Sequence, residues 1–415
     1  MKKFLGIFIL VLFLLLVGCS DAADYYPSYD GGPLGGELYY DSSFSSKGDV
    51  EGEGGEEKEN DVTLQAGQLT ASATFDNQKF DFWKGLITSN QEGDGLFKEY
   101  DERFAFKTKN RITLTFPKGT YARVDLVEKD NVKFTSYADA SGVCYIFSDE
   151  SKESYKLNIE YLDKDNNMVT LEDEVSGDKE YTIEALEKSR DLIEIMFVID
   201  ATGSMGDEMR YLNAEIVDVI KKVKQDNGNV RILVSTMVYR DKGDDYVTRY
   251  SDFAEDVNKQ IQFLGKQKAD GGGDFEEAVQ TALKEASEKQ WTTSASTKIL
   301  VHVADAPAHD QDVNSWNETV KVLASKGIRI LTVASSGIDK KTEYFFRCQS
   351  LITNGVYVHL TNDSGIGGEH IKATVEEKEE VELLNDCLVR IINGMHSGEY
   401  ASPINWRQSQ SKPAE

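Results

Sequence analysis

The sequence predicts an α/β fold with a doubly wound parallel sheet over residues 188–396, preceded by a smaller all-β sandwich over residues 67–187. Two patterns support this prediction. After residue 190, apolar runs alternate with helical patterns, the order that produces a parallel sheet. Between residues 68 and 186, apolar residues instead recur with period two between short turn signals, which is typical of a β-sandwich.

The N-terminal residues 1–18 are predicted to be a signal peptide. Lys2 and Lys3 precede the apolar stretch Phe4–Val17, which is short for a membrane span. The stretch ends in Leu-Val-Gly-Cys, which resembles a bacterial lipobox and implies cleavage before Cys19 and a lipid on Cys19. A plain secretory signal is the alternative. The resemblance places the protein on a bacterial cell membrane, facing the periplasm or the cell exterior, with the bilayer as partner through Cys19 only.

Residues 19–66 are predicted to be a disordered acidic tether. They are rich in Gly, Ser, Asp, Glu and Tyr and poor in aliphatic residues, so they bury too little apolar surface to offset chain entropy. The whole chain has a formal net charge of −26, which argues against nucleic acid as a partner. At the other end, residues 397–415 are predicted to be a flexible tail.

The predicted sandwich contains four clear strand patterns, bounded by turn signals rich in Asp, Asn, Ser and Gly. The stretch Asp139–Gly142 weakly resembles the immunoglobulin-like, carboxypeptidase-regulatory type of repeat. Residues 68–100 are predicted to form a helical or irregular lead-in that packs on one of the two domains. The four strands are Ile112–Phe116, Ala122–Leu126, Val143–Phe147 and Tyr155–Ile159.

The predicted α/β domain contains six strands with helices between them, and one of these strands lies at an edge. The strands are Ile195–Ile199, Val230–Val238, Val247–Phe253 (the edge strand), Lys298–Ala304, Ile328–Val333 and Val356–Leu360. The helices are Met205–Val223, Ala254–Leu264, Phe275–Glu288, Val313–Ser325, 341–352 and 377–394.

The strand Ile195–Ile199 leads directly into a polar loop. Its apolar run is typical of a strand covered on both faces, and Asp200, Thr202 and Ser204 follow at alternate positions. Open α/β sheets place ligand sites outside the carboxyl ends of their strands. Carboxylate and hydroxyl oxygens are hard ligands that suit Mg²⁺, Mn²⁺ or Ca²⁺. The loop therefore predicts part of a divalent-cation site.

Two further carboxylates follow other strands of the same predicted sheet. Asp274 comes after Gly271–Gly273 and before a predicted helix, and Asp305 directly follows the strand Lys298–Ala304. Converging carboxylates repel one another without a cation, and at least one would have to keep its proton. The predicted metal ligands are Asp200, Thr202, Ser204, Asp274 and Asp305.

This pattern resembles the von Willebrand factor type A (VWA) domain and its metal-ion-dependent adhesion site. That family has Asp-x-Ser-x-Ser on the first loop, a Thr on the second and an Asp on the third, so Asp200, Thr202, Ser204 and Asp305 match. The second-loop Thr has no match, and Asp274 occupies roughly its place. The resemblance implies a Mg²⁺ cofactor (or Mn²⁺ or Ca²⁺) and a protein partner that offers a carboxylate to the metal, in adhesion or assembly of an envelope complex.

Two other functions remain open from the sequence. In one, the domain is a structural envelope module and the metal only stabilises the fold. In the other, the protein is a metal-assisted hydrolase that uses Asp305 with His309, which lies four residues further on. The sequence has no Gly-x-Ser-x-Gly, His-Glu-x-x-His or Walker motif, so we expect a binding protein and no enzyme.

Three cysteines remain in addition to Cys19. They are Cys144, Cys348 and Cys387, so one intramolecular disulfide at most can form among them. Cys348 and Cys387 fall on predicted helices of the same domain and are the favoured pair. Three buried free thiols are the equally weighted alternative.

Overall fold

The computed structural model describes residues 65–88, 94–104, 106–187, 190–293, 295–372, 374–376 and 378–409. The predicted signal peptide, Cys19 and all but the end of the predicted tether lie outside the described residues. Within these ranges, no helix combines the length and the apolar character needed to cross a membrane.

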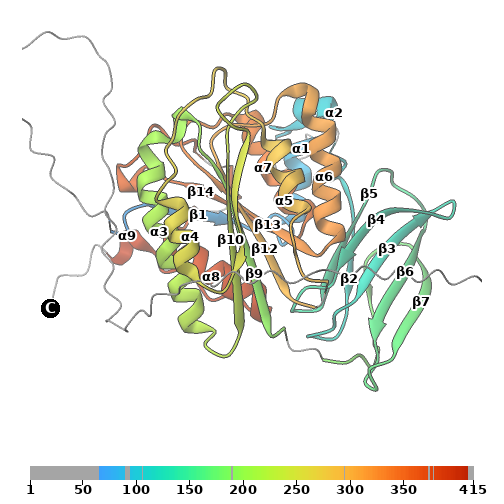
Figure 1. The fold of residues 1–415 in the computed structure, drawn as a ribbon. Coiled ribbons are helices and arrows are strands. Elements are labelled where there is room, and N and C mark those ends of the chain that lie inside the picture. The colour runs from blue at the N-terminus through green and yellow to red at the C-terminus, as the bar shows by residue number, and fades with distance from the viewer. Residues whose placement is uncertain are drawn as a thin grey trace, which may run out of the picture. The chain divides into compact units, whose positions relative to one another are not determined.

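An eight-stranded sheet forms the centre of the α/β part, in the order β11-β10-β9-β12-β13-β14-β1-β15 (Figure 1). The five strands from β10 to β14 in this order run parallel, and β11 pairs with β10 as an antiparallel edge strand. Six of these strands confirm the predicted ones. Their bounds are β9 Leu192–Asp200, β10 Arg231–Tyr239, β11 Thr248–Ala254, β12 Thr297–Ala304, β13 Ile328–Ala334 and β14 Val356–Leu360.

Helices cover both faces of this sheet, so the predicted doubly wound arrangement is confirmed (Figure 1). On one face lie α3, α4 and α8, and on the other lie α1, α5, α6 and α7. Their bounds are α1 Phe80–Thr88, α3 Gly206–Asp226, α4 Val257–Leu264, α5 Val279–Ser287, α6 Val313–Ser325, α7 Lys340–Ile352 and α8 Leu384–Ser397.

The structure corrects the predicted sandwich boundary at residue 67. The strand β1 (Thr70–Thr74) belongs to the large sheet, where Ala71 pairs with Leu360 of β14, and β15 (Glu382–Leu383) pairs with its other side. The carboxylate of Glu215 on α3 holds the start of β1, because it accepts hydrogen bonds from three consecutive backbone N–H groups at 2.8–3.1 Å. The polar, five-residue β1 gives no strong strand signal, which explains the misplaced boundary.

The two helices that follow β1 also pack on the α/β part. Trp83 of α1 is fully buried, and its ring stacks on that of Tyr344 of α7 with 6.2 Å between centroids. Asp76, between β1 and α1, forms a buried ion pair with Arg347 of α7, with 3.0 Å between Oδ2 and Nε. These contacts, together with α2 (Lys98–Phe104), confirm the predicted helical lead-in and show which domain it joins.

The all-β part consists of two sheets, in the orders β5-β2-β8 and β4-β3-β6-β7. Phe134 of one sheet and Phe147 of the other meet edge to face, with 5.8 Å between centroids. The four predicted strands are present, whereas β4 and β7, which carry many exposed residues, were not predicted. The bounds are β2 Asn110–Thr115, β3 Arg123–Glu128, β4 Asn131–Tyr137, β5 Val143–Ser148, β6 Tyr155–Leu162, β7 Met168–Val175 and β8 Lys179–Glu180.

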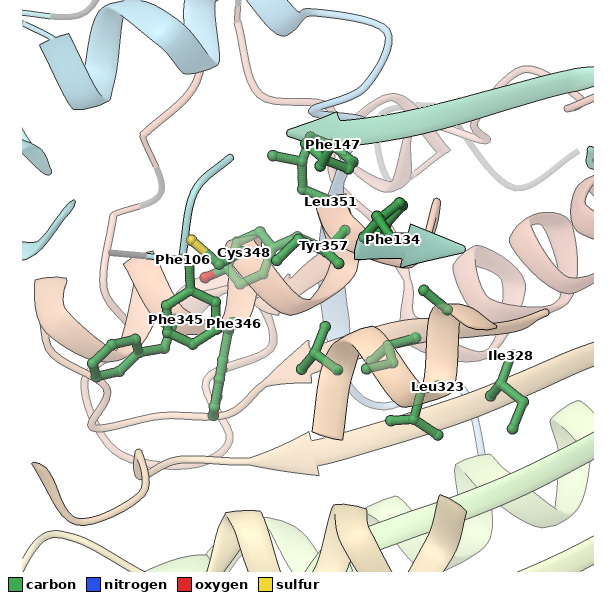
Figure 2. Packing of buried hydrophobic residues seen from close by; sticks show 14 of the residues in the cluster. Phe106, Phe134, Phe147, Leu323, Ile328, Phe345, Phe346, Cys348, Leu351 and Tyr357 are labelled. Carbon is green, nitrogen blue, oxygen red and sulfur yellow. The ribbon is translucent and has the colours of Figure 1, made fainter. Parts of the chain in front are cut away.

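One apolar core runs from the α7 side of the large sheet into the sandwich. Figure 2 shows Phe134 and Phe147 close to Leu351 of α7, with Phe345, Phe346 and Cys348 in the same layer. The two parts therefore share buried surface rather than being joined only by the chain.

The equally weighted alternative of three buried free thiols is confirmed, and the Cys348–Cys387 disulfide does not form. Both thiols are free and buried, as is Cys144. Cys348 belongs to the core under α7, whereas Cys387 on α8 belongs to the core on the opposite face of the sheet. The sheet therefore separates the two sulfur atoms.

The C-terminal region differs from its prediction in two ways. The last long helix, α8, begins at Leu384 rather than at residue 377, because residues 382–383 form β15 instead. The predicted flexible tail 397–415 folds back on the α/β part as far as residue 409, where α9 (Trp406–Ser409) ends. Arg407 forms an ion pair with Asp363 at 2.7 Å, and the ring of Tyr400 packs on that of Phe75.

We expect Trp83→Ala to lower the free energy of unfolding by about 3–5 kcal/mol, because it removes a large, fully buried ring from the core under α7. Urea unfolding followed by circular dichroism measures the loss, and hydrogen exchange should show faster exchange of the α7 amides. Ile404→Ala, at an exposed position, is the control and should leave both unchanged. Unaltered α7 exchange in Trp83→Ala would contradict the assignment of α1 to the α/β part.

Candidate metal site

The first loop of the site follows β9, whose last residue is Asp200. Asp200 is fully buried, and its Oδ1 accepts hydrogen bonds from the backbone N and the hydroxyl of Thr202 at 2.9 and 2.7 Å. The hydroxyls of Thr202 and Ser204 are 3.2 Å apart. The other oxygen of Asp200, Oδ2, has no hydrogen-bond partner among the described residues. The predicted cluster of Asp200, Thr202 and Ser204 is therefore assembled.

The third loop, which follows β12, places Asp305 beside the loop that begins at Asp200. Strand β12 lies parallel beside β9, with Val303 paired to Ile199, so Asp305 emerges next to Asp200. Asp305 is buried, and its Oδ1 also lacks a hydrogen-bond partner in the described part of the chain. Burial and the charge of Asp305 raise the pKa of Asp200 to about 7. Burial raises the pKa of Asp305 to about 6, although a hydrogen bond with Ser204 opposes the rise.

The second loop is tied to the first through the backbone. The N–H groups of Gly203 and Asp270 donate to the carbonyls of Gly271 and Ala201, each at 3.1 Å. Gly271 and Gly272 adopt φ values of 79° and 76°, a region that favours glycine. A Cβ on Gly272 would lie 3.0 Å from the carboxylate of Glu277, so the loop presses directly on this side chain.

Glu277, which the sequence analysis missed, is the buried carboxylate of the second loop. It is 2% exposed, its N–H donates to the carbonyl of Pro307 at 2.9 Å, and its Oε2 has no hydrogen-bond partner within the described ranges. Burial, and then the charges of Asp200, Asp241 and Asp305, raise its pKa to about 9. The carboxylates of the other two loops therefore act on Glu277 through their charge.

Asp274, the predicted ligand from the second loop, is exposed. The structure groups it with Asp241 and His309, so its role as a ligand beside Asp200 stays a prediction. The predicted helix Phe275–Glu288 begins only at Val279, because residue 277 forms a bridge to Ala308 of the third loop. This bridge, rather than a helical turn, directs Glu277 inward.

A fourth carboxylate, Glu208 of α3, closes the cluster from the helix side. It is 1% exposed, and its Oε1 accepts a hydrogen bond from the backbone of Ser336 at 2.9 Å and lies 3.3 Å from Nε2 of His370. Its Oε2 has no partner among the residues described. A sequence signal for Glu208 exists: it lies on the apolar face of α3, next to Met205, Met209 and Leu212.

The remaining charged and polar neighbours have other partners. Arg240 donates to the carbonyls of Ala201 and Lys268 at 3.1 and 2.9 Å, so it links the first loop to the segment that leads into the second. His302 lies in the core, where burial lowers its pKa to about 3. The Nε2 of His309 is 2.9 Å from Asp241. The histidine that a hydrolase would pair with Asp305 thus contacts a different carboxylate.

The donor set fits a divalent cation. Asp200, Glu277 and Asp305 each present a buried oxygen without a hydrogen-bond partner in the described residues, and Thr202 and Ser204 add hydroxyls. Oxygen donors alone suit Mg²⁺, Mn²⁺ or Ca²⁺. A cation there would offset the repulsion that raises the pKa values of these carboxyl groups.

The comparison of sequences finds similarity over part of the chain. The profile of the von Willebrand factor A domain matches residues 194–374. The chain is 26% identical over 201 residues to a putative ariadne-like RING finger protein of Acanthamoeba polyphaga mimivirus, covering 44% of this chain and 20% of that protein. It is 24% identical over 161 residues to alpha-protein kinase vwkA of Dictyostelium discoideum, covering 38% of this chain and 25% of the kinase. The match thus spans a quarter or less of each relative.

Two solved structures of bacterial proteins are similar to part of the chain. Conserved hypothetical protein BatB from Bacteroides thetaiotaomicron has a TM-score of 0.28 and 13% identity, over 52% of this chain and 93% of that chain. The pilus adhesin SpaC from Lactobacillus rhamnosus GG, in its open conformation, has a TM-score of 0.35 and 12% identity, over 66% of this chain and 34% of that chain.

The raised pKa values predict how stability depends on pH in metal-free protein. Asp200 and Glu277 keep protons in the folded state at pH values where the unfolded chain has lost them, so the free energy of unfolding falls as pH rises from the unfolded value near 4 to the folded values of about 7 and about 9. Each group contributes a slope of at most about 1.4 kcal/mol per pH unit.

Urea unfolding in the presence of EDTA, repeated across this pH range, measures the slope. Glu277→Gln should make the slope shallower, most clearly above pH 7, because it removes the group with the higher pKa. Glu276→Gln is the matched control, since Glu276 is in the same loop but forms an ion pair with Lys341 at 2.9 Å. Equal slopes for Glu277→Gln and wild type would show that Glu277 is ionised in the folded protein.

Proposed function

Because residues 194–374 belong to the von Willebrand factor A domain family, we propose that this protein binds a protein partner through a divalent cation held at the carboxyl ends of β9 and β12. The family match and the all-β sheets beside it support a protein-interaction module. The observation that carries the proposal is the set of buried carboxylate oxygens of Asp200, Glu277 and Asp305 without hydrogen-bond partners in the described part of the chain.

Each residue of the site has a distinct task in this proposal. Asp200 and Asp305 supply carboxylate oxygens, and Glu277 adds a third negative charge from the second loop. Thr202 orients Asp200 through two hydrogen bonds. Ser204 is exposed, so its hydroxyl marks the side from which a partner reaches the cation. The ion, when bound, supplies a positive charge with an open position for a carboxylate of the partner.

The choice of ion follows from the donors. All are oxygen atoms, which favours Mg²⁺, with Mn²⁺ and Ca²⁺ as alternatives. Three carboxylates around one divalent ion leave the site with a net negative charge. The electrostatic attraction of a partner's carboxylate is therefore weaker here than at a site whose second loop supplies a neutral hydroxyl. We therefore expect modest affinity and fast release, as suits a reversible contact.

The location proposed for this activity is a bacterial cell membrane, facing the periplasm or the cell exterior, with Cys19 as the lipid-bearing residue. The sequence Leu-Val-Gly-Cys at the end of the apolar N-terminal stretch supports it. The acidic residues 51–59 argue for a role at a distance from anionic lipid rather than on its surface.

We expect Mg²⁺ and Mn²⁺ to raise the melting temperature of the purified protein by several degrees. A site filled a hundredfold above its Kd adds about 2.7 kcal/mol to the free energy of unfolding. Asp305→Asn should abolish the shift, whereas Asp310→Asn, at an exposed ion-paired position on the same loop, should preserve it. The metal-free melting temperature of each variant is measured separately, because Asp305→Asn itself relieves repulsion.

Retention of a partner from cell-envelope extract then separates the two leading functions. Retention that requires Mg²⁺ and is lost in Asp305→Asn supports binding through the metal. A thermal shift together with metal-independent retention, or with none, supports a cation that only stabilises the fold. The absence of a thermal shift with Mg²⁺, Mn²⁺ and Ca²⁺ would reject the metal site.

A further inference from the structure

A second group of metal-ligating side chains lies beside the first and has no role in the proposed binding of the partner. It consists of Asp241, Asp274 and His309, whose ligand atoms all lie within 4.8 Å of one another. The three residues come from three different loops, after β10, before α5 and after β12. Ligands of one ion at bond lengths of about 2.0–2.2 Å are roughly 3–4 Å apart, so a small movement of exposed Asp274 would complete the set.

The charges of this group are not balanced by lysine or arginine. Asp241 is nearly buried and contacts the Nε2 of His309 at 2.9 Å, and in the described residues neither it nor Asp274 forms an ion pair with lysine or arginine. The nearest lysine in sequence, Lys242, pairs with Asp312 at 2.7 Å instead. Two carboxylates therefore share a single imidazole, which leaves the group negative whether or not the imidazole is protonated.

Glu277, which the proposed function assigns to the first site, also lies beside this group. Its carboxylate is buried, and one of its oxygens lacks a hydrogen-bond partner in the described chain. Its backbone bridge to Ala308 places it next to His309, and its Oε1 adjoins Gly272, whose N–H donates to Asp244 at 3.0 Å.

We infer that Asp241, Asp274 and His309 form a second divalent-metal site, selective for a transition ion such as Zn²⁺, Mn²⁺ or Co²⁺ over Mg²⁺. One imidazole with two carboxylates is a nitrogen and oxygen donor set that transition ions bind better than Mg²⁺ or Ca²⁺. Three protein ligands, one of them exposed, leave a position open to water or a ligand. The site shares no ligand with the one in the proposed function, and the inference stands without that function.

The test uses Co²⁺, whose visible absorption reports its ligands, titrated into the purified, EDTA-stripped protein with excess Mg²⁺ present to occupy the first site. We expect one equivalent of Co²⁺ to bind. His309→Gln and Asp274→Asn should each weaken its binding at least tenfold. Asp274 is exposed, so Asp274→Asn preserves the fold even if His309→Gln disturbs it.

Two control variants separate this site from the first one. Asp312→Asn removes a nearby carboxylate that has its own lysine partner, and it should bind Co²⁺ as wild type does. Asp305→Asn should lose the Mg²⁺-dependent thermal shift but keep the bound Co²⁺. Wild-type Co²⁺ affinity in both His309→Gln and Asp274→Asn would overturn the inference. Loss of Co²⁺ in Asp305→Asn alone would also overturn it, by assigning the ion to the first site.

Discussion

The crowding of acidic side chains at one end of the large sheet is the constraint on which the rest of the site depends. Asp200, Glu208, Glu277 and Asp305 are all nearly inaccessible to solvent, and the charges of Asp200 and Asp305 act on Glu277 as that of Glu208 acts on Asp305. Their mutual repulsion is resisted by backbone hydrogen bonds that join the loops, from Gly203 to Gly271 and from Glu277 to Pro307. The fold thus holds together charges that would separate in a flexible chain, which is how a rigid scaffold prepares a cation site in advance.

The α/β part is assembled from two separated stretches of the chain. β1 and the helices after it complete one edge of the sheet and cover α7, while the all-β part lies between them and β9 in sequence. The ion pair of Asp76 with Arg347 is buried, so it fixes this junction in one arrangement, and either charge alone would be costly there. The all-β part is therefore an insertion held at both ends by the same domain.

Long apolar runs made most of the fold predictable. β9, β12 and β14 are buried along their length, and runs such as Ile195–Ile199 show this directly in the sequence. β1 was misplaced because its pattern is short and polar. The choice between Asp274 and Glu277 depends on a single backbone bridge, which periodicity does not encode. Helix patterns do not tell which face of a sheet each helix covers, so the Cys348–Cys387 disulfide and three free thiols remained equal alternatives until the structure showed free thiols.

The pairing of β1 with β14 also has a consequence for the order of folding. Ala71 pairs with Leu360, so the ribosome makes one partner of this pair long before the other. While the all-β part and four parallel strands emerge, β1 lacks its strand partner β14. Such long-range pairing slows folding and leaves apolar surface exposed to aggregation. The first strand of the α/β part, β1, can therefore pair only after β14, one of its last strands, has been synthesised.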